Sequence, residues 1–181
     1  MILTINRLDY TAAIDAASPL TIERTLNAPS LCRFALSLPP CGSLPVPARF
    51  QSLSVTGDDG AVYFTGYIAA TPLPEYAGLA LEGPRYRFQL QALSDEMLLD
   101  QALASASRGA AGTTAVALLT NLAAHTGSTA LATTALSLDA PVAQFTPAPA
   151  APFSKSAGQV AAYARAAYRA QSGALSLAAV P

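Results

Sequence analysis

Within the first 95 residues, apolar and polar side chains alternate along several segments, with the period of two that half-buried β-strands require. Apolar residues occupy every second position of Leu31–Leu38 and of Arg85–Leu93. The dipeptide Asp59-Gly60 separates two β-rich runs and predicts a hairpin turn, whereas the Pro- and Gly-containing segment Thr71–Pro84 predicts a loop. Six strands are expected, over Met1–Leu8, Leu20–Leu26, Leu31–Leu38, Ala48–Val55, Ala61–Ala69 and Arg85–Leu93. This spacing predicts an antiparallel barrel or sandwich.

The pattern changes after Ser94, where apolar residues recur at helical spacing. Asp95 and Glu96 suit the first turn of a helix, because carboxylates favour the positive end of the helix dipole. Four further segments are expected to be regular: a helix over Thr113–His125 ended by Gly127, a short strand over Leu136–Asp139, a long helix over Ser156–Ala170 and a closing strand over Ala174–Val180. The first helix is expected to continue through Leu103, and the Ala- and Pro-rich residues 140–153 are expected to form an extended connector. We therefore predict an α+β fold with an antiparallel β domain over residues 1–95 and a mixed α/β domain over residues 96–181.

Charge is scarce in this chain. Only 12% of its 181 residues are charged and the net charge is −1, against about 25% charged residues in an average soluble domain. This balance removes the basis for nonspecific nucleic-acid binding, which needs clustered cations. The scarcity of charged residues also favours a protein surface that is covered by partner subunits. The N-terminal sequence lacks the pattern of a signal peptide, and no run reaches the ~18 apolar residues of a membrane span, so synthesis in a bacterial cytoplasm is expected.

Few side chains offer titratable chemistry. His125, the only histidine, lies in the last turn of a predicted helix, where a cation or donor suits the helix C-terminus. Cys32 and Cys41 lack the spacing and the accompanying ligands of a metal site, and in a chain without a secretion signal we expect both thiols to be reduced. Neither a cofactor nor a metal ion is expected.

The acidic residues have structural interpretations. Asp58 and Asp59 belong to the predicted hairpin turn, and no spacing of a calcium loop accompanies them. Asp95, Glu96 and Asp100 could be imagined as an acid/base pair, but acidic residues are expected in a first helical turn for dipole reasons alone. The glycines of the segment from Ala106 to Gly112 match no phosphate-binding loop. An enzyme is therefore not expected.

Two predicted strands carry residues suited to an interface between subunits. The run Ala61–Ala69 has apolar side chains on both of its faces, and Arg85 and Arg87 lie on the face of their strand opposite Tyr86 and Phe88. Contiguous exposed apolar surface marks interaction sites. A sugar- or base-binding platform of aromatic rings is an alternative use of Tyr63, Phe64, Tyr67, Tyr86 and Phe88. The candidate interface residues are Phe64, Tyr67, Ile68, Arg85 and Arg87.

The order of these pieces resembles the phage tail hub family, the proteins at the tip of contractile and non-contractile tails. Three stretches carry the resemblance: the string Phe64-Thr65-Gly66-Tyr67-Ile68, the strand and acidic, Leu-rich helix start over Tyr86–Asp100, and the helix, strand, helix and strand order from Thr113 to the sequence ALSLAAV. Together they cover most of the chain.

The resemblance implies a β-barrel of the tail-tube type followed by a mixed α/β domain. It also implies a non-catalytic subunit that assembles as a trimer, joins the tail tube to the baseplate or spike, and resides in a phage or phage-like particle. Family members continue into a second tube-type barrel, so the chain is expected to be an N-terminal fragment or a shortened relative. Two other hypotheses are a carbohydrate- or surface-binding β module, based on the Tyr-rich strands, and a small hydrolase.

Overall fold

The chain folds into two compact units. The structure, a computed structural model, describes residues 1–81, 83–101, 113–138, 140–147 and 150–180. Unit 1 consists of Met1–Glu23 and Ser30–Ser94, and unit 2 consists of Arg24–Pro29 and Asp95–Pro181. The named strands pair antiparallel in both units, and the helices of the described residues belong to unit 2 except for one 3-10 turn. The fold is therefore α+β, as the hydrophobic pattern predicts.

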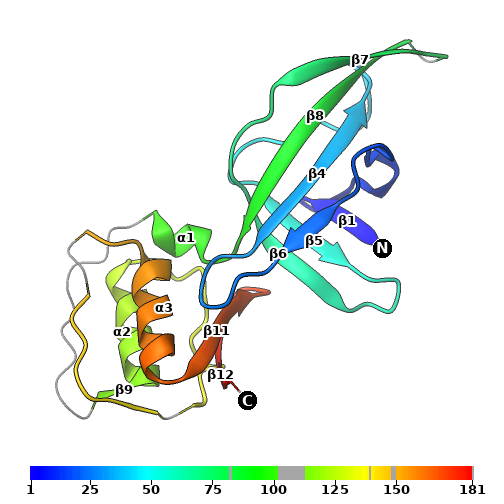
Figure 1. The fold of residues 1–181 in the computed structure, drawn as a ribbon. Coiled ribbons are helices and arrows are strands. Elements are labelled where there is room, and N and C mark those ends of the chain that lie inside the picture. Colours follow the sequence, from blue (N-terminus) through cyan, green and yellow to red (C-terminus); the bar gives the residue numbers. More distant parts are fainter. Residues whose placement is uncertain (82, 102–112, 139, 148–149, 181) are drawn as a thin grey trace. The chain divides into compact units, whose positions relative to one another are not determined.

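Unit 1 is built around an antiparallel eight-stranded sheet (Figure 1). Its strands pair in the order β2-β1-β5-β6-β8-β4-β3, and β7 pairs with β8 beside this path. The elements are β1 (Ile2–Ile5), β2 (Leu8–Asp9), the 3-10 turn η1 (Thr11–Ala13), β3 (Thr21–Glu23), β4 (Leu31–Leu38), β5 (Ser52–Thr56), β6 (Val62–Ile68), β7 (Pro74–Ala80) and β8 (Gly83–Ser94).

The period-two alternation explains the core of unit 1. On β4, Cys32, Phe34 and Leu36 are 0–3% exposed and pack with the alternate apolar residues of β8. The predicted hairpin between β5 and β6 is confirmed: Asp59 Oδ1 accepts the Ala61 N–H at 3.0 Å, and Gly60 adopts a φ of 78°. Asp59 thus serves the turn, as the sequence predicts.

The loop predicted over Thr71–Pro84 is wrong, because β7 occupies Pro74–Ala80. Proline and glycine are typical of loops, but Pro74 and Gly78 can both be accommodated in this strand. Pro74 begins the strand at the edge of the sheet, where a missing N–H costs nothing, and the register shifts between Tyr76 and Gly78, where Gly78 has a φ of 114°. The pairing of unit 1 follows an open path, since its end strands β2 and β3 form no ladder with each other among the described residues. A closed barrel therefore stays a prediction.

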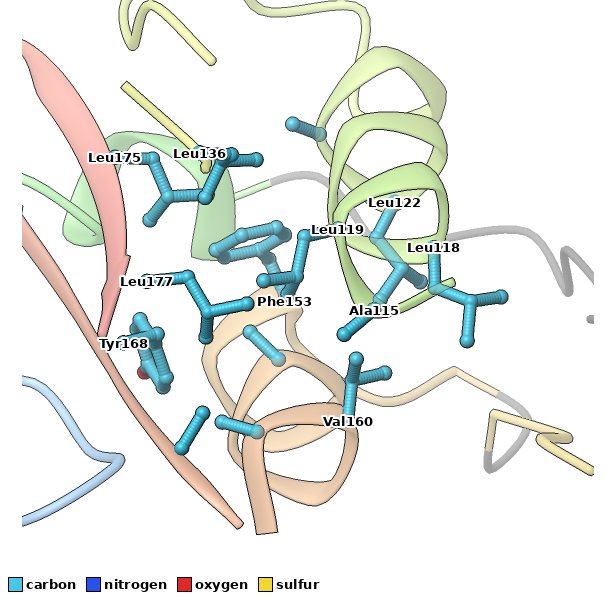
Figure 2. Packing of buried hydrophobic residues seen from close by; sticks show 14 of the residues in the cluster. Ala115, Leu118, Leu119, Leu122, Leu136, Phe153, Val160, Tyr168, Leu175 and Leu177 are labelled. Carbon is cyan, nitrogen blue, oxygen red and sulfur yellow. The ribbon is translucent and has the colours of Figure 1, made fainter. Parts of the chain in front are cut away.

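Unit 2 packs two helices against a hairpin (Figure 2). Figure 2 shows Phe153 between Leu119 of one helix and Leu177 of the hairpin, and Phe153 is fully buried. The elements are α1 (Met97–Asp100), β9 (Thr113–Thr114), α2 (Ala115–His125), β10 (Pro141–Val142), α3 (Phe153–Tyr163), β11 (Ala166–Gln171) and β12 (Ala174–Ala179). Helix α2 is confirmed, with Thr114 Oγ1 accepting the Ala117 N–H at its start and Gly127 at a φ of 67° beyond its end.

The helix predicted over Ser156–Ala170 is confirmed as far as Tyr163 and is wrong beyond it. Arg165 adopts a φ of 50°, which ends the helical path after Tyr163, and the chain returns as β11. In β11 the buried residues Ala166, Tyr168 and Ala170 alternate with exposed or half-buried ones, as in a strand. Ala166 and Ala170 are also four residues apart, a spacing that fits one face of a helix. Ser172 and Gly173 take positive φ values of 54° and 71°, as a two-residue hairpin turn requires.

Two shorter predictions also differ. The helix expected to run from Asp95 through Leu103 ends as α1 at Asp100, and its last two residues lie outside the described residues. The strand expected over Leu136–Asp139 is a single bridge between Leu136 and Leu177; Asp139 lies outside the described residues, as do Ala106–Gly112.

Candidate assembly surface

Two of the five candidate interface residues lie in the core of unit 1. Phe64 and Ile68 are 3% and 0% exposed, because the alternation of β6 turns both toward the apolar interior of the sheet. They are therefore removed from the candidate surface. Tyr67 lies between them on the opposite face of β6 and is half-buried.

Arg85 and Arg87 lie on the outer face of β8 and are half-buried. Arg87 Nε is 2.9 Å from Asp15 Oδ2, and Arg85 donates a 3.5 Å hydrogen bond to the carbonyl of Ser37. With Glu75 and the backbone of β7 they line a groove of about 490 Å³. Both arginines thus stabilise unit 1 and place positive charge beside β7.

The β7–β8 ribbon carries exposed apolar side chains that sequence reasoning missed. Leu73, Tyr76, Leu79 and Leu81 are between 65% and 109% exposed; we call these four residues the apolar edge. The last pair of β4 with β8 is Leu38 with Tyr86, whereas β7 and β8 remain paired to Ala80 and Gly83 (Figure 1). The ribbon therefore extends beyond β4, and β7 has a strand on one side only among the described residues. The uncharged run from Tyr76 to Leu81 is the signal that could have identified it.

Two of the five aromatic residues of the alternative sugar- or base-binding platform are buried and are therefore removed from it. Phe64 and Phe88 are buried in the core. Tyr76 and Tyr86 meet edge to face, with ring centroids 6.0 Å apart and planes at 71°. This arrangement packs the ribbon and does not present two coplanar faces to a sugar.

The three acidic residues at the start of unit 2 bind backbone and hydroxyl groups of the same unit. Asp95 Oδ2 accepts the Gly173 N–H at 3.0 Å, in the turn between β11 and β12. Glu96 Oε1 accepts the Ala170 N–H at 3.4 Å. Asp100 accepts both the Ser154 N–H, at 2.7 Å, and the Ser154 hydroxyl, at 2.6 Å. These contacts support the structural interpretation of all three carboxylates.

Tyr168 packs beside these carboxylates on β11. Burial raises the pKa of its hydroxyl, and the negative charges of Glu96 and Asp100 raise that pKa further. The hydroxyl therefore stays neutral near pH 7, and it donates a 3.4 Å hydrogen bond to the Ser154 carbonyl.

Residues 24–29 form a strap that protects the edge of β11. Asn27 Nδ2 donates to the Ala166 carbonyl at 3.0 Å, and Asn27 Oδ1 accepts the Tyr168 N–H at 2.9 Å. Gly158 of α3 leaves room for the strap, since a Cβ there would lie 2.5 Å from the Asn27 carbonyl oxygen. The side-chain amide thus takes the place of a neighbouring strand and prevents other strands from pairing with this edge.

His125 and the two cysteines are the remaining candidates for chemistry. His125 Nδ1 lies 2.6 Å from the Asn121 carbonyl oxygen, in the last turn of α2. Cys32 is buried and Cys41 is exposed, and both are free thiols. Within the described ranges, no three His, Cys, Asp or Glu side chains could hold a metal ion. None of the helices in those ranges is long and apolar enough to span a membrane.

The two thiols are expected to react very differently with Ellman's reagent. Burial raises the pKa of Cys32 to about 12, so its reactive thiolate is scarce at pH 8 and its sulfur is shielded. We expect the native protein to release one equivalent of chromophore within minutes, through Cys41, and a second only in denaturant. Cys41→Ser should abolish the fast phase; a fast phase that survives this substitution contradicts the assignment.

The fold is similar to three solved structures of tail-type proteins. The first is the 43 kDa tail protein of prophage MuSo2 from Shewanella oneidensis, with a TM-score of 0.68, 12% identity, and coverage of 98% of this chain and 52% of that one. The second is a tail protein from Neisseria meningitidis MC58, with a TM-score of 0.68, 14% identity, and coverage of 97% and 49%.

The third is the E. coli c3393 protein, a type VI secretion system component described as structurally similar to the bacteriophage T4 tail proteins gp27 and gp5. It matches with a TM-score of 0.55, 10% identity, and coverage of 97% and 47%. This chain therefore spans about half the length of each. No family model matches the chain, and no curated protein matches it significantly. The resemblance to phage tail proteins is thus confirmed in the fold.

Proposed function

We propose that this chain is a structural, non-catalytic component of a phage or phage-derived tail, with a hub-like role in joining the tail tube to the baseplate or spike. The observation that carries the proposal is the likeness over 98% of the chain to a prophage tail protein. The acidic residues and His125 support it, because each of them is occupied in contacts within its own unit.

Assembly with copies of itself and with neighbouring tail proteins is part of the proposal, and a trimer is the state that the family resemblance implies. The apolar edge supports assembly, since large exposed apolar side chains concentrated on and directly beside one strand mark interaction sites. The scarcity of charge, 12% of residues, supports it as well. We propose that the protein is made in the bacterial cytoplasm and then incorporated into the tail of the particle.

A tail-tube-type barrel in unit 1 is the finer part of the proposal. The segment Tyr10–Asp15 passes from β1 to β4 and binds both strands: the Tyr10 N–H donates to the Leu3 carbonyl at 2.8 Å, and the Asp15 N–H donates to the Ala35 carbonyl at 2.9 Å. Ile14 and Leu36 form an antiparallel bridge at the same place. These contacts support a barrel that is closed by an irregular segment.

The proposal is tested by locating the protein in particles. In a bacterial strain that carries the gene, antibodies against this chain are expected to label one end of the tails of purified particles in electron micrographs. Deleting the gene should remove complete tails, and expressing it from a plasmid should restore them. Normal tails from the deletion strain would contradict a structural role, and label along the whole tube would contradict a hub-like position.

A further inference from the structure

We propose that the β7–β8 ribbon of one copy packs against the turn between β5 and β6 of the next copy, so that three copies close head to tail into a ring. The inference deepens the proposed function and rests on it, because it names the two surfaces that form the trimer. Such a contact is heterologous, since each copy contributes its ribbon to one neighbour and its turn to the other. Threefold symmetry repeats this one contact three times.

The described residues leave an apolar face of the ribbon exposed. On this face Tyr76 lies opposite Tyr86, and Leu79 lies opposite Pro84. Tyr86 packs against the core of unit 1. Side chains two positions apart on a strand share a face, so Pro84 continues the core-facing side of β8 beyond its last pair with β4. Tyr76 and Leu79 are 65% and 79% exposed there, and a contact with another copy would cover them.

A second apolar surface lies beside the turn between β5 and β6. Thr56 of β5 lies opposite both Ile2 of β1 and Val62 of β6, so these three residues form one row across the sheet. Ile2, Val62 and Tyr63 are 44%, 39% and 43% exposed; we call these three residues the turn patch. Contiguous exposed apolar side chains mark interaction sites. The turn patch can therefore receive the apolar face of a ribbon.

The two surfaces lie at opposite ends of the sheet. Strand β6 meets β8 where Gly66 lies opposite Ser94, and its first residues extend past Ser94 toward the turn. The ribbon ends at Gly83, at the other end of β8 (Figure 1). One copy can therefore use both surfaces at once, each with a different neighbour. A partner of another kind would need to match only one of them, so two unlike apolar surfaces favour a ring of copies.

Opposite charges accompany the two surfaces. In the turn beside the turn patch, the side chain of Asp58 is 88% exposed and forms an ion pair with the amine of Met1; Asp59 adds a second carboxylate. On the ribbon, Arg85 lies opposite Gly78, beyond the last pair of β8 with β4. The head-to-tail contact brings Arg85 of one copy beside the acidic turn of the next. This complementarity fixes which end of one copy meets which end of its neighbour.

Charge exchange tests the contact in the whole chain. Wild-type protein is expected to sediment as a trimer at micromolar concentration. Asp58→Arg and Arg85→Asp should each raise the concentration needed for half-assembly at least about tenfold, because each places like charges together at all three contacts. The double variant D58R/R85D should restore it to within about threefold of wild type, and circular dichroism verifies that each variant keeps the fold. A double variant as weak as the single ones would reject the contact between these charges.

Leu79→Arg tests the apolar part of the same contact. It should leave the protein monomeric at concentrations where wild type is trimeric, because it places a charge among apolar side chains at the centre of the contact. Leu26→Arg is the matched control, since Leu26 is 66% exposed but lies in the strap, outside both surfaces. This control should remain trimeric. Equal loss of the trimer in both variants would reject the ribbon as the specific surface.

Cross-linking distinguishes a head-to-tail ring from a twofold contact. In a Cys41→Ser background, Tyr63→Cys with Leu79→Cys should form covalently linked trimers under mild oxidation, because each copy is then joined to both of its neighbours. The two single-cysteine variants are the matched controls. Each presents only one half of the contact and should remain unlinked. Dimers formed by the Leu79→Cys variant alone would show that two ribbons meet each other and would overturn the ring.

Two further outcomes would overturn the inference. They are a monomer at about 100 µM, where even weak specific complexes form, and a trimer that Leu79→Arg and both charge changes leave intact. Failure of the proposed function is distinguishable, because it appears as an absence of label on particles. Labelled, complete tails built from the Leu79→Arg protein would reject the ribbon contact and leave the tail role intact.

Discussion

Replacing Gly66 with alanine is expected to unfold unit 1. A Cβ at this position would lie 2.1 Å from the Leu93 carbonyl oxygen and 2.8 Å from the Leu93 carbonyl carbon. These are backbone atoms of the neighbouring strand β8, which cannot move aside as the end of a flexible side chain can. The ladder between β6 and β8 has three pairs, Gly66 with Ser94, Tyr67 with Leu93 and Ile68 with Ala92. Separating the strands would therefore break the whole ladder.

We expect Gly66→Ala to lower the free energy of unfolding by about 4 kcal/mol or more, measured by urea denaturation, and to leave most of the protein insoluble on expression. Gly60→Ala is the matched control. Gly60 has a φ of 78° but no heavy atom within 4 Å of the Cβ position, so its substitution costs only backbone strain, about 1 kcal/mol. Equal stabilities of the two variants would show that the need for glycine at position 66 does not come from the close approach of the β8 backbone.

The string Phe64-Thr65-Gly66-Tyr67-Ile68 also shows which features of the fold can be predicted from the sequence. Its alternation predicts a strand, and the strand is present as β6. The resemblance to tail proteins depended in part on this string, and the fold confirms that resemblance. The requirement for glycine depends on Leu93, 27 positions away, and a local pattern holds no information about that contact.

Predictions from local sequence patterns were wrong where one pattern fits two kinds of secondary structure. The small residues of β11 fit one face of a helix as well as one face of a strand. In the structure Arg165 has a positive φ, which ends the helix, and the following residues pair with β12 as a strand. Likewise Pro74 and Gly78 indicate a loop unless the strand lies at an edge, and an edge is a property of the whole sheet. Tertiary pairing overrides local propensity in both cases.

The candidate surface was predicted only in part, for the same reason. Tyr67, Arg85 and Arg87 face outward, because β-strand alternation assigns opposite faces to neighbouring residues. When both faces of a strand carry apolar residues, the alternation does not tell which face is buried. Phe64 and Ile68 were therefore assigned to the interface, although they lie in the core. Four exposed residues of the ribbon were missed, since exposure at an edge follows from the position of β7 beside β8.

Replacing Asp100 with alanine is expected to destabilise unit 2 almost as strongly as the Gly66 change affects unit 1. The start of α3 has no side-chain cap of its own, since Pro152 is its N-cap residue. Asp100 of α1 supplies the cap from elsewhere in the unit, because its carboxylate accepts the Ser154 N–H at 2.7 Å and the Ser154 hydroxyl at 2.6 Å. A negative charge at the start of a helix is also favourable for the helix dipole.

We expect Asp100→Ala to cost about 3 kcal/mol, because two charge-assisted hydrogen bonds are lost and Ser154 is only 9% exposed to replacement water. In a chain of this size that corresponds to a fall of roughly 6–12 °C in the melting temperature. Ser154→Ala removes the hydroxyl bond but keeps the N–H bond and should cost about 1 kcal/mol. The double variant D100A/S154A should then be less destabilised than the sum of the single changes, because the hydroxyl bond is lost only once. Strict additivity in calorimetry would mean that Asp100 and Ser154 act independently, and the cap would then have to be assigned to another group.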